Sequence, residues 1–268
     1  MATTVEAAGL TAAAKEAVRD LILVLADSKR LLGMRYGQWI LGAPELEAGI
    51  ACAAMAQDEW GHARLFYALL KDFGEDVAML EHGREPHQYA SIEALDAEPA
   101  DWFGFVAMNA LVDTALSVQC EALRGSSYAP LAQRVEKLLD EERFHGAHGT
   151  AWFNRLARAG GDAADALAAA AEATVPGILR WFGPDSDRAR LMVEAGVVDA
   201  AGSALRERYL ERIGGLLDAL GARGAAMRSH APSFDGFDEA RRRVSTTGPD
   251  GETVARIRGD KNRMFLVD

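Results

Sequence analysis

Two Glu-x-x-His pairs are the residues of this chain whose types and spacing could bind a metal ion. The first is Glu59-Trp60-Gly61-His62 and the second is Glu142-Arg143-Phe144-His145. Residues three apart lie on one face of a helix, so the Glu and the His of each pair can reach the same ion. Chance could supply one such pair, and the surroundings of the two pairs therefore decide how they are interpreted.

Both pairs interrupt apolar stripes that recur at steps of three and four residues, the pattern of a core-facing helix. The stripe around the first pair includes Cys52, Met55, Phe66 and Leu69, and that around the second includes Val135, Leu138, Trp152 and Leu156. A carboxylate buried there is costly unless its charge is compensated. We interpret the pairs as two halves of one metal site, and the alternative is a surface or purely hydrogen-bonded pair.

A third acidic residue, Asp113, has the position expected of a further ligand. A dinuclear carboxylate site in a four-helix bundle takes one carboxylate from each of two helices and a Glu-x-x-His from each of the other two. Asp113 lies on the apolar stripe of a predicted helix over residues 101–124. Glu121 is the fallback nearer the end of that helix, and an exposed Asp113 is the alternative.

The N-terminal helix lacks the fourth carboxylate. Its stripe offers only Lys29 at mid-depth, and Gln38 lies on a neighbouring face nearer the end. Glu59, Asp113 and Glu142 together with a protonated lysine leave a charge that one divalent ion would neutralise. An ammonium among acids can instead replace a metal. The alternative for Lys29 is a side chain that reaches the surface at a helix edge.

The elements that must position these residues are all helical, and we expect an all-α four-helix bundle with additional C-terminal helices. The predicted helices cover residues 11–41 with Thr11 as N-cap, 44–73 beginning at Pro44, 101–124, 129–159, 162–182 with an interruption at Pro176-Gly177, and 186–220. Residues 75–99 read as a long connecting loop. We predict a helical domain over residues 1–228 and a partly ordered tail over residues 229–268. Each candidate ligand falls near the middle of its helix, which places all of them at one level.

Composition limits the partners and the location. The net charge is −11, which argues against nucleic acid as the main partner because phosphate binding needs a basic face. The Arg241-Arg242-Arg243 run is interpreted as a solvated helix face. The chain has 2 cysteines, Cys52 and Cys120, and lacks both a leader pattern and a long apolar run, so we expect a cytoplasmic protein with no membrane anchor.

Further runs carry a family resemblance over about residues 20–220. They are Gly42-Ala43-Pro44-Glu45-Leu46-Glu47, Ala56-Gln57-Asp58-Glu59-Trp60-Gly61-His62-Ala63-Arg64, Leu111-Val112-Asp113, Ser127-Tyr128-Ala129-Pro130, Glu141-Glu142-Arg143-Phe144-His145 and Phe182-Gly183-Pro184. Together they resemble the bacterial phenylacetyl-CoA epoxidase (ring 1,2-epoxidase) family, whose large subunits are ferritin-like bundles. The tail lies outside the resemblance.

That family pairs a catalytic large subunit, which holds a di-iron centre, with a homologous structural subunit whose ligands have degenerated. The resemblance places the family's ligands on Glu59, His62, Asp113, Glu142 and His145. The position of the N-terminal glutamate falls on Lys29, a departure from the catalytic pattern. Residues 25–27 and 36–39 look more like the structural subunit, so the chain combines features of both.

The resemblance implies a subunit of a multicomponent di-iron-type oxygenase for aromatic acyl-CoA, acting in phenylacetate catabolism. Glu59 and Glu142 would then be catalytic. The metal would be iron, with manganese as the alternative, and the site could hold one ion or none. Phe66, Phe144 and Leu138 are candidates for an apolar substrate cavity. The implied partners are a homologous large subunit, within an assembly that is at least a dimer, and a separate flavin and iron-sulfur reductase. The alternatives are a non-catalytic structural partner whose site is closed by Lys29 and, less favoured, iron storage or peroxide reduction.

Overall fold

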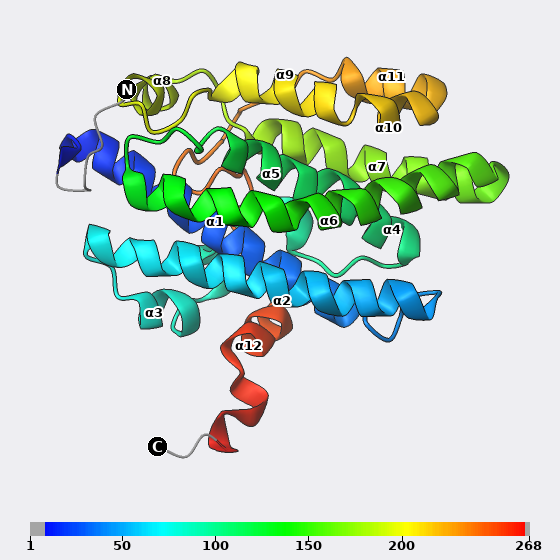
Figure 1. Cartoon of the computed structure of the whole chain (residues 1–268), viewed down its shortest axis with the longest axis horizontal. Helices are drawn as coiled ribbons and strands as arrows, with labels where there is room; N and C mark the ends of the chain where they lie inside the picture. Colours follow the sequence, from blue (N-terminus) through cyan, green and yellow to red (C-terminus); the bar gives the residue numbers. More distant parts are fainter. Residues whose placement is uncertain (1–8, 266–268) are drawn as a thin grey trace.

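The computed structural model describes residues 9–265, and long helices form the body of the molecule (Figure 1). The four that build the bundle are α1 (Ala12–Gln38), α2 (Leu46–Leu69), the continuous segment Trp102–Glu121, and α6 (Ala129–Ala159). Among residues 9–265 there is no β-strand, only an isolated bridge between Asp238 and Arg243. The all-α, ferritin-like fold is confirmed.

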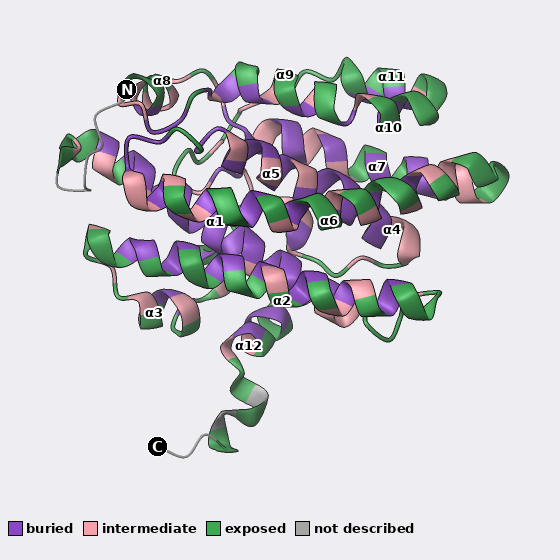
Figure 2. Ribbon diagram, in the orientation of Figure 1, coloured by how far each residue is buried: buried purple, intermediate pink, exposed green. Residues whose placement is uncertain are grey.

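The inner faces of these helices are apolar and buried, whereas their outer faces are exposed (Figure 2). Thr11 caps α1 as predicted, because its hydroxyl accepts a hydrogen bond from the amide of Ala14. The first helix nevertheless ends at Gln38, three residues before Leu41. The second begins at Leu46 because Glu45 is extended, so the prediction that Pro44 starts it is wrong. The 3-10 turn η2 (Leu70–Phe73) ends it at Gly74, whose left-handed backbone suits glycine.

The connection over residues 75–99 is more structured than the predicted loop. It contains α3 (Val77–His82) and two 3-10 turns, η3 (Pro86–Gln88) and η4 (Glu93–Leu95). A buried ion pair between Asp27 and Arg84 attaches this segment to α1, and Asp27 also accepts hydrogen bonds from Tyr67 and from the amide of Ala90. The connection therefore covers one side of the bundle.

The third bundle helix contains a π-helical insertion. It runs through α4 (Trp102–Ala107), the π segment η5 (Met108–Asp113) and α5 (Thr114–Glu121). This stretch is long and apolar enough to cross a membrane, but most of it is buried as the core helix of the bundle. The π segment approaches α6 closely, because a Cβ added at Gly149 would lie 2.9 Å from the Cα of Ala110. A π turn shifts the face of the residues around it and often marks a functional site.

The C-terminal helices differ from the prediction at two places. The helix α7 (Gly161–Trp181) continues through Pro176, since its buried apolar face holds it against the bundle, so the predicted interruption is wrong. The single helix predicted over residues 186–220 is also wrong. It is divided into α8 (Asp187–Glu194), α9 (Gly202–Arg212), α10 (Gly214–Ala219) and α11 (Gly221–Arg228). Left-handed backbone at Gly196, Gly202 and Gly221 separates the pieces.

The segment after residue 229 ends in α12 (Gly251–Arg258), which contacts α1 and α3, and in η6 (Asp260–Phe265), which extends away from the bundle (Figure 1). Arg242 and Arg243 are buried and not helical, so the interpretation as a solvated helix face is wrong. Arg243 forms an ion pair with Asp96, and Arg242 donates a hydrogen bond to Gln119 at 2.6 Å. These partners come from distant segments, which satisfies the guanidinium groups inside the protein. The division into a helical domain over residues 1–228 and a tail over residues 229–268 stays a prediction.

Candidate metal centre

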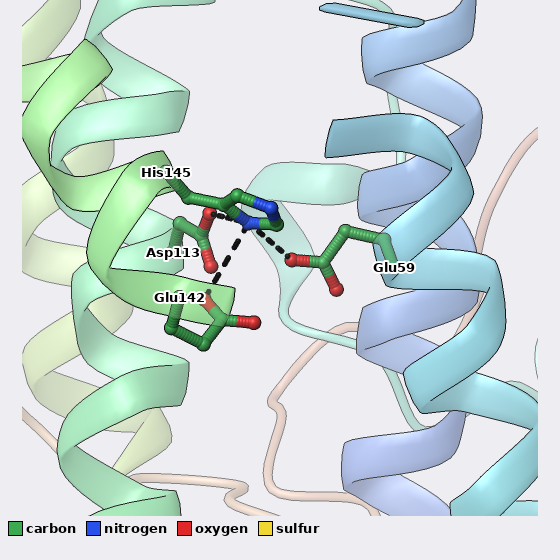
Figure 3. Close-up of side chains that lie close together, drawn as sticks. All are labelled: Glu59, Asp113, Glu142 and His145. Carbon is green, nitrogen blue, oxygen red and sulfur yellow. Dashed lines mark hydrogen bonds and ion pairs between the residues drawn. The ribbon is translucent and has the colours of Figure 1, made fainter. Parts of the chain in front are cut away.

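The five predicted ligands converge in the interior of the bundle. Glu59 and His62 come from α2, Asp113 from the end of η5, and Glu142 and His145 from α6, and each is at most 5% exposed. Figure 3 shows Asp113, Glu142 and His145 directed toward Glu59 across the bundle. The mid-helix positions explain why these side chains meet at one level.

Lys29 lies at the middle of this cluster. Its ammonium, which is fully buried, donates hydrogen bonds to Glu142 Oε1 at 2.6 Å, Glu59 Oε1 at 2.9 Å and Asp113 Oδ1 at 3.1 Å. An ammonium has three donors, so these three carboxylates satisfy it completely. The interpretation that places the ammonium of Lys29 among the acids is confirmed, and the surface alternative is wrong.

Each imidazole joins the buried carboxylates to an acid nearer the surface. In His145, Nδ1 lies 3.2 Å from both Glu59 Oε1 and Asp113 Oδ2, and Nε2 lies 3.3 Å from Asp58 Oδ2. In His62, Nδ1 lies 3.1 Å from Glu142 Oε1 and Nε2 lies 2.8 Å from Glu141 Oε2. The outer acids each precede a predicted glutamate by one residue. That adjacency is the sequence signal that could have identified them.

A further set of polar side chains completes the cluster, and the sequence had suggested such a role for His148 alone, with a helix-surface position as its alternative. Tyr36 donates a hydrogen bond to Asp113 Oδ2 at 2.7 Å and accepts one from Asn109 Nδ2 at 2.8 Å. Ser117 donates to Glu142 Oε2 at 3.2 Å, and His148 Nδ1 lies 2.9 Å from Asn109 Oδ1. All of these belong to the core stripes or lie next to them, but their contacts depend on helix rotations that periodicity does not define.

Charge interactions set the protonation of the lysine and of the acids. Burial by itself lowers the pKa of Lys29, but Asp113, Glu142 and Glu59 outweigh it and raise that pKa well above its ordinary value. Burial would raise the pKa of Glu59 and of Asp113, yet the lysine charge holds both below their usual values. For Glu142, burial and the two neighbouring carboxylates prevail, and its pKa is raised.

The imidazoles are also held in their charged form. Burial disfavours the imidazolium, but Glu142 and Glu59 raise the pKa of His62 to about 10, and Asp113 and Glu59 raise that of His145 to about 11. One ammonium and two imidazolium groups thus lie among five carboxylates, because Glu141 contacts His62 and Asp58 contacts His145 from the outer side of the cluster. These three groups offset much of the carboxylate charge without a metal ion.

These residues do not fit a two-metal centre. Glu59, Asp113, Glu142 and His145 each offer a ligand atom within 4.8 Å of the others, a spacing that a single ion could bridge. The ammonium of Lys29, however, contacts the three carboxylates that would have to bind such an ion. Lys29 thus occupies the space between these carboxylates that such an ion would take.

Other residues that the sequence suggested lie away from the centre. Glu121 forms an ion pair with Arg212 at 2.8 Å on the outer side of α5, and Gln38 accepts a hydrogen bond from Arg35 at 3.1 Å. Phe144 is 78% exposed and cannot line an internal substrate cavity, whereas Phe66 and Leu138 are buried in the core. The nomination of Phe144 is therefore wrong, because a residue two positions after Glu142 lies on roughly the opposite face of α6.

Comparison with known proteins gives one family and two curated relatives. A family model described as "Phenylacetic acid catabolic protein" matches residues 1–230. Over 118 residues, 42% of this chain and 37% of the relative, the chain is 35% identical to one subunit of the 1,2-phenylacetyl-CoA epoxidase of Escherichia coli (strain K12). Over 136 residues, 50% of this chain and 55% of the relative, it is 28% identical to a different subunit of the same organism's epoxidase. The matches span less than two thirds of either relative.

Proposed function

Because the chain belongs to the phenylacetic acid catabolic protein family, we propose that it is a non-catalytic subunit of a multicomponent oxygenase that acts on an aromatic acyl-CoA. In this role its bundle supports a homologous large subunit, which carries the metal and reacts with oxygen. The chain would then be the structural partner subunit and not the catalytic subunit of the oxygenase.

A single observation carries this proposal, the three hydrogen bonds from the ammonium of Lys29 to Glu59, Asp113 and Glu142. Removing one partner of a buried, fully hydrogen-bonded ion pair is strongly destabilising, because the other charge is left buried without compensation. The carboxylates that a catalytic homologue would use for metal binding are therefore engaged with the lysine in this bundle. Closing the site in this way leaves the bundle intact as a partner surface.

The comparisons are compatible with this role, since the chain resembles two different subunits of one epoxidase. Electrons for such a reaction would come from a separate flavin and iron-sulfur reductase. The two cysteines of this chain, Cys52 and Cys120, are free, buried and on different helices, and an iron-sulfur cluster needs several cysteine ligands. Their free state suits the cytoplasm, which is the location that we propose.

A second candidate function is a metal-binding oxygenase subunit in which Glu59 and Glu142 are catalytic. The observation in its favour is that four ligand atoms, from these two residues with Asp113 and His145, lie within 4.8 Å of one another. In that case Lys29 would have to leave its three carboxylates before iron or manganese could bind. Its hydrogen bonds, each at most 3.1 Å, make that displacement costly.

Activity of the assembled complex separates the two functions. The chain would be coexpressed with the reductase and with each homologous large subunit, and oxygen-dependent conversion of phenylacetyl-CoA would be followed by mass spectrometry. Replacing His62 by Gln in this chain should leave turnover within about twofold, because the proposal gives it no contact with the reacting atoms. The same replacement in the partner's own Glu-x-x-His pair should abolish turnover.

Size-exclusion chromatography of each variant complex provides the control for assembly. If the complex still forms but His62→Gln in this chain lowers turnover about a hundredfold, the chain is catalytic and the proposal fails. If the wild-type chain forms no complex with any homologous large subunit, the scaffold role fails as well. Either result would favour the second candidate function, in which this chain itself binds the metal.

A further inference from the structure

A cavity of about 360 Å³ lies on the outer side of the helix turn that carries Glu59 and His62. Its walls come from α1, α2, α3 and α12, and they include Arg30, Trp60, Arg64, Glu81, Arg256 and Ile257. We call this space the arginine cavity. Its volume lies in the range of sites that bind small molecules, roughly 300–1,000 Å³. The arginine cavity is separate from the closed carboxylate cluster.

The arginine cavity is basic, although the chain as a whole has a net charge of −11. Three arginines and one glutamate line its walls, and one of these arginines, Arg256, forms an ion pair with Glu252 just outside them. Arg64 is exposed and makes no hydrogen bond or ion pair with the residues that the structure describes. Glu81 lies 3.5 Å from Arg30, too far for strong pairing. Guanidinium donors therefore remain for an anion.

One wall is a firmly held aromatic ring. The indole of Trp60 lies against α1 so closely that a Cβ added at Gly33 would be 2.7 Å from its Cδ1 atom. The side chain is nevertheless 43% exposed. An aromatic ring that is fixed on one side and open on the other can contact a flat ligand at little entropic cost. Arginines beside such a ring are the combination that recognises an aromatic group joined to an anion.

The opposite wall comes from α12, in which Ile257 is buried and Arg256 borders the cavity. Arg30 fixes this wall, because its Nη2 donates a hydrogen bond to the carbonyl of Ile257 at 2.9 Å. Residues 251–258 lie beyond the stretch 1–230 that matches the family model. The complete arginine cavity is thus formed by the bundle together with a segment outside that match.

From these features we propose that the arginine cavity binds a phosphate monoester attached to a flat aromatic base, the chemistry of a nucleotide. A phosphate monoester carries about −1.5 to −2 at neutral pH and offers three acceptor oxygens to the guanidinium groups of the walls. Arginine forks bind phosphate oxygens in bidentate geometry. The base would lie beside Trp60. A free mononucleotide and the 3′-phosphoadenosine end of coenzyme A share this chemistry.

Isothermal titration of the full chain tests the proposal, with AMP, coenzyme A, adenosine and inorganic phosphate as probes. We expect AMP to bind at least about tenfold more tightly than adenosine or phosphate alone, because only AMP engages both walls. A coenzyme A affinity well above that of AMP would identify the ligand as the coenzyme, and this arm alone depends on the proposed function. Equal affinities would identify a free mononucleotide.

Two variants assign the binding to the cavity. Arg64→Gln should weaken AMP binding at least about tenfold, since a hydrogen bond to a charged group is lost. Arg124→Gln changes an exposed arginine in the turn that follows the third bundle helix, outside the cavity, and should leave the affinity unchanged. Absence of AMP and coenzyme A binding at millimolar concentration, or equal weakening by both variants, would overturn the proposal. Neither residue contacts the buried core, so both variants should fold.

Discussion

Removing the charge of Lys29 is the perturbation that tests the closed centre through protein stability. Methionine has a similar length and no charge, so Lys29→Met leaves Glu59, Asp113 and Glu142 buried together without their shared cation. All three of their hydrogen bonds to the ammonium, at 2.6 to 3.1 Å, are lost inside the protein. Both effects destabilise the folded state.

The expected loss can be estimated from the burial of the partners. Removing one member of a buried, hydrogen-bonded ion pair costs about 3–5 kcal/mol, and Lys29 has three such partners, each at most 5% exposed. The loss will be limited because Glu142, whose pKa burial and its neighbours already raise, can take up a proton. We expect Lys29→Met to lower the free energy of unfolding by about 3–5 kcal/mol. That is a large share of the roughly 5–15 kcal/mol of a typical protein.

Equilibrium urea unfolding at neutral pH, followed by far-ultraviolet circular dichroism with a chelator present, measures this loss. Lys137→Met is the matched control, because the side chain of Lys137 is 78% exposed and its ammonium lies 3.6 Å from Glu141. An exposed ion pair contributes at most about 1 kcal/mol. A loss for Lys29→Met no larger than that of the control would refute the reasoning. Manganese should restabilise Lys29→Met but not the wild type, since only the variant leaves its carboxylates free for a cation.

Three further predictions concern other parts of the account. Nearby carboxylates raise the pKa of His62 to about 10 and that of His145 to about 11. The stability that these two imidazolium groups contribute is fully present below the pKa of a histidine in the unfolded chain, about 6.5, and it is lost as the pH rises through 10 and 11. Urea titrations should show a falling free energy of unfolding over that range, and a constant value would contradict the protonation argued here. Gly33→Ala places a Cβ 2.7 Å from Trp60 and should cost about 1–3 kcal/mol in the same assay, whereas Gly61→Ala meets nothing within 4 Å and is the control. Burial raises the pKa of Cys52 to about 12 and also raises the pKa of Cys120. Neither thiol should therefore react with a disulfide reagent at about pH 8 until urea unfolds the chain. Rapid reaction of either thiol in the folded protein would contradict their burial.

Helical periodicity was sufficient to predict the centre of the molecule. A residue on an apolar stripe at mid-helix must lie in the core of a bundle, and Lys29, Asp113 and both Glu-x-x-His pairs do lie there. Charge compensation then required the lysine to meet the acids. The ends of the helices were predicted less accurately. At Leu41, the predicted end of the first helix, and at Pro44, the predicted start of the second, local sequence preferences and tertiary packing compete.

The remaining features depend on contacts between distant segments, which a single sequence does not define. The π segment at residues 108–113 forms where α6 approaches through Gly149, and no local signal specifies it. Arg243 looks like a surface residue until Asp96 is placed beside it. The same holds for the arginine cavity, whose walls come from residues 30 and 256 at opposite ends of the chain.

A metal count on purified protein tests the central claim most directly. Wild type and Lys29→Glu would be produced in cells supplemented with iron and manganese and analysed by plasma mass spectrometry, with circular dichroism to verify that both are folded. Because the ammonium holds Glu59, Asp113 and Glu142, the wild type should contain well under one ion per chain. Lys29→Glu restores the fourth carboxylate of a dinuclear site and should raise the count toward two. Two irons at full occupancy in the wild type would contradict the closed centre and support the catalytic function.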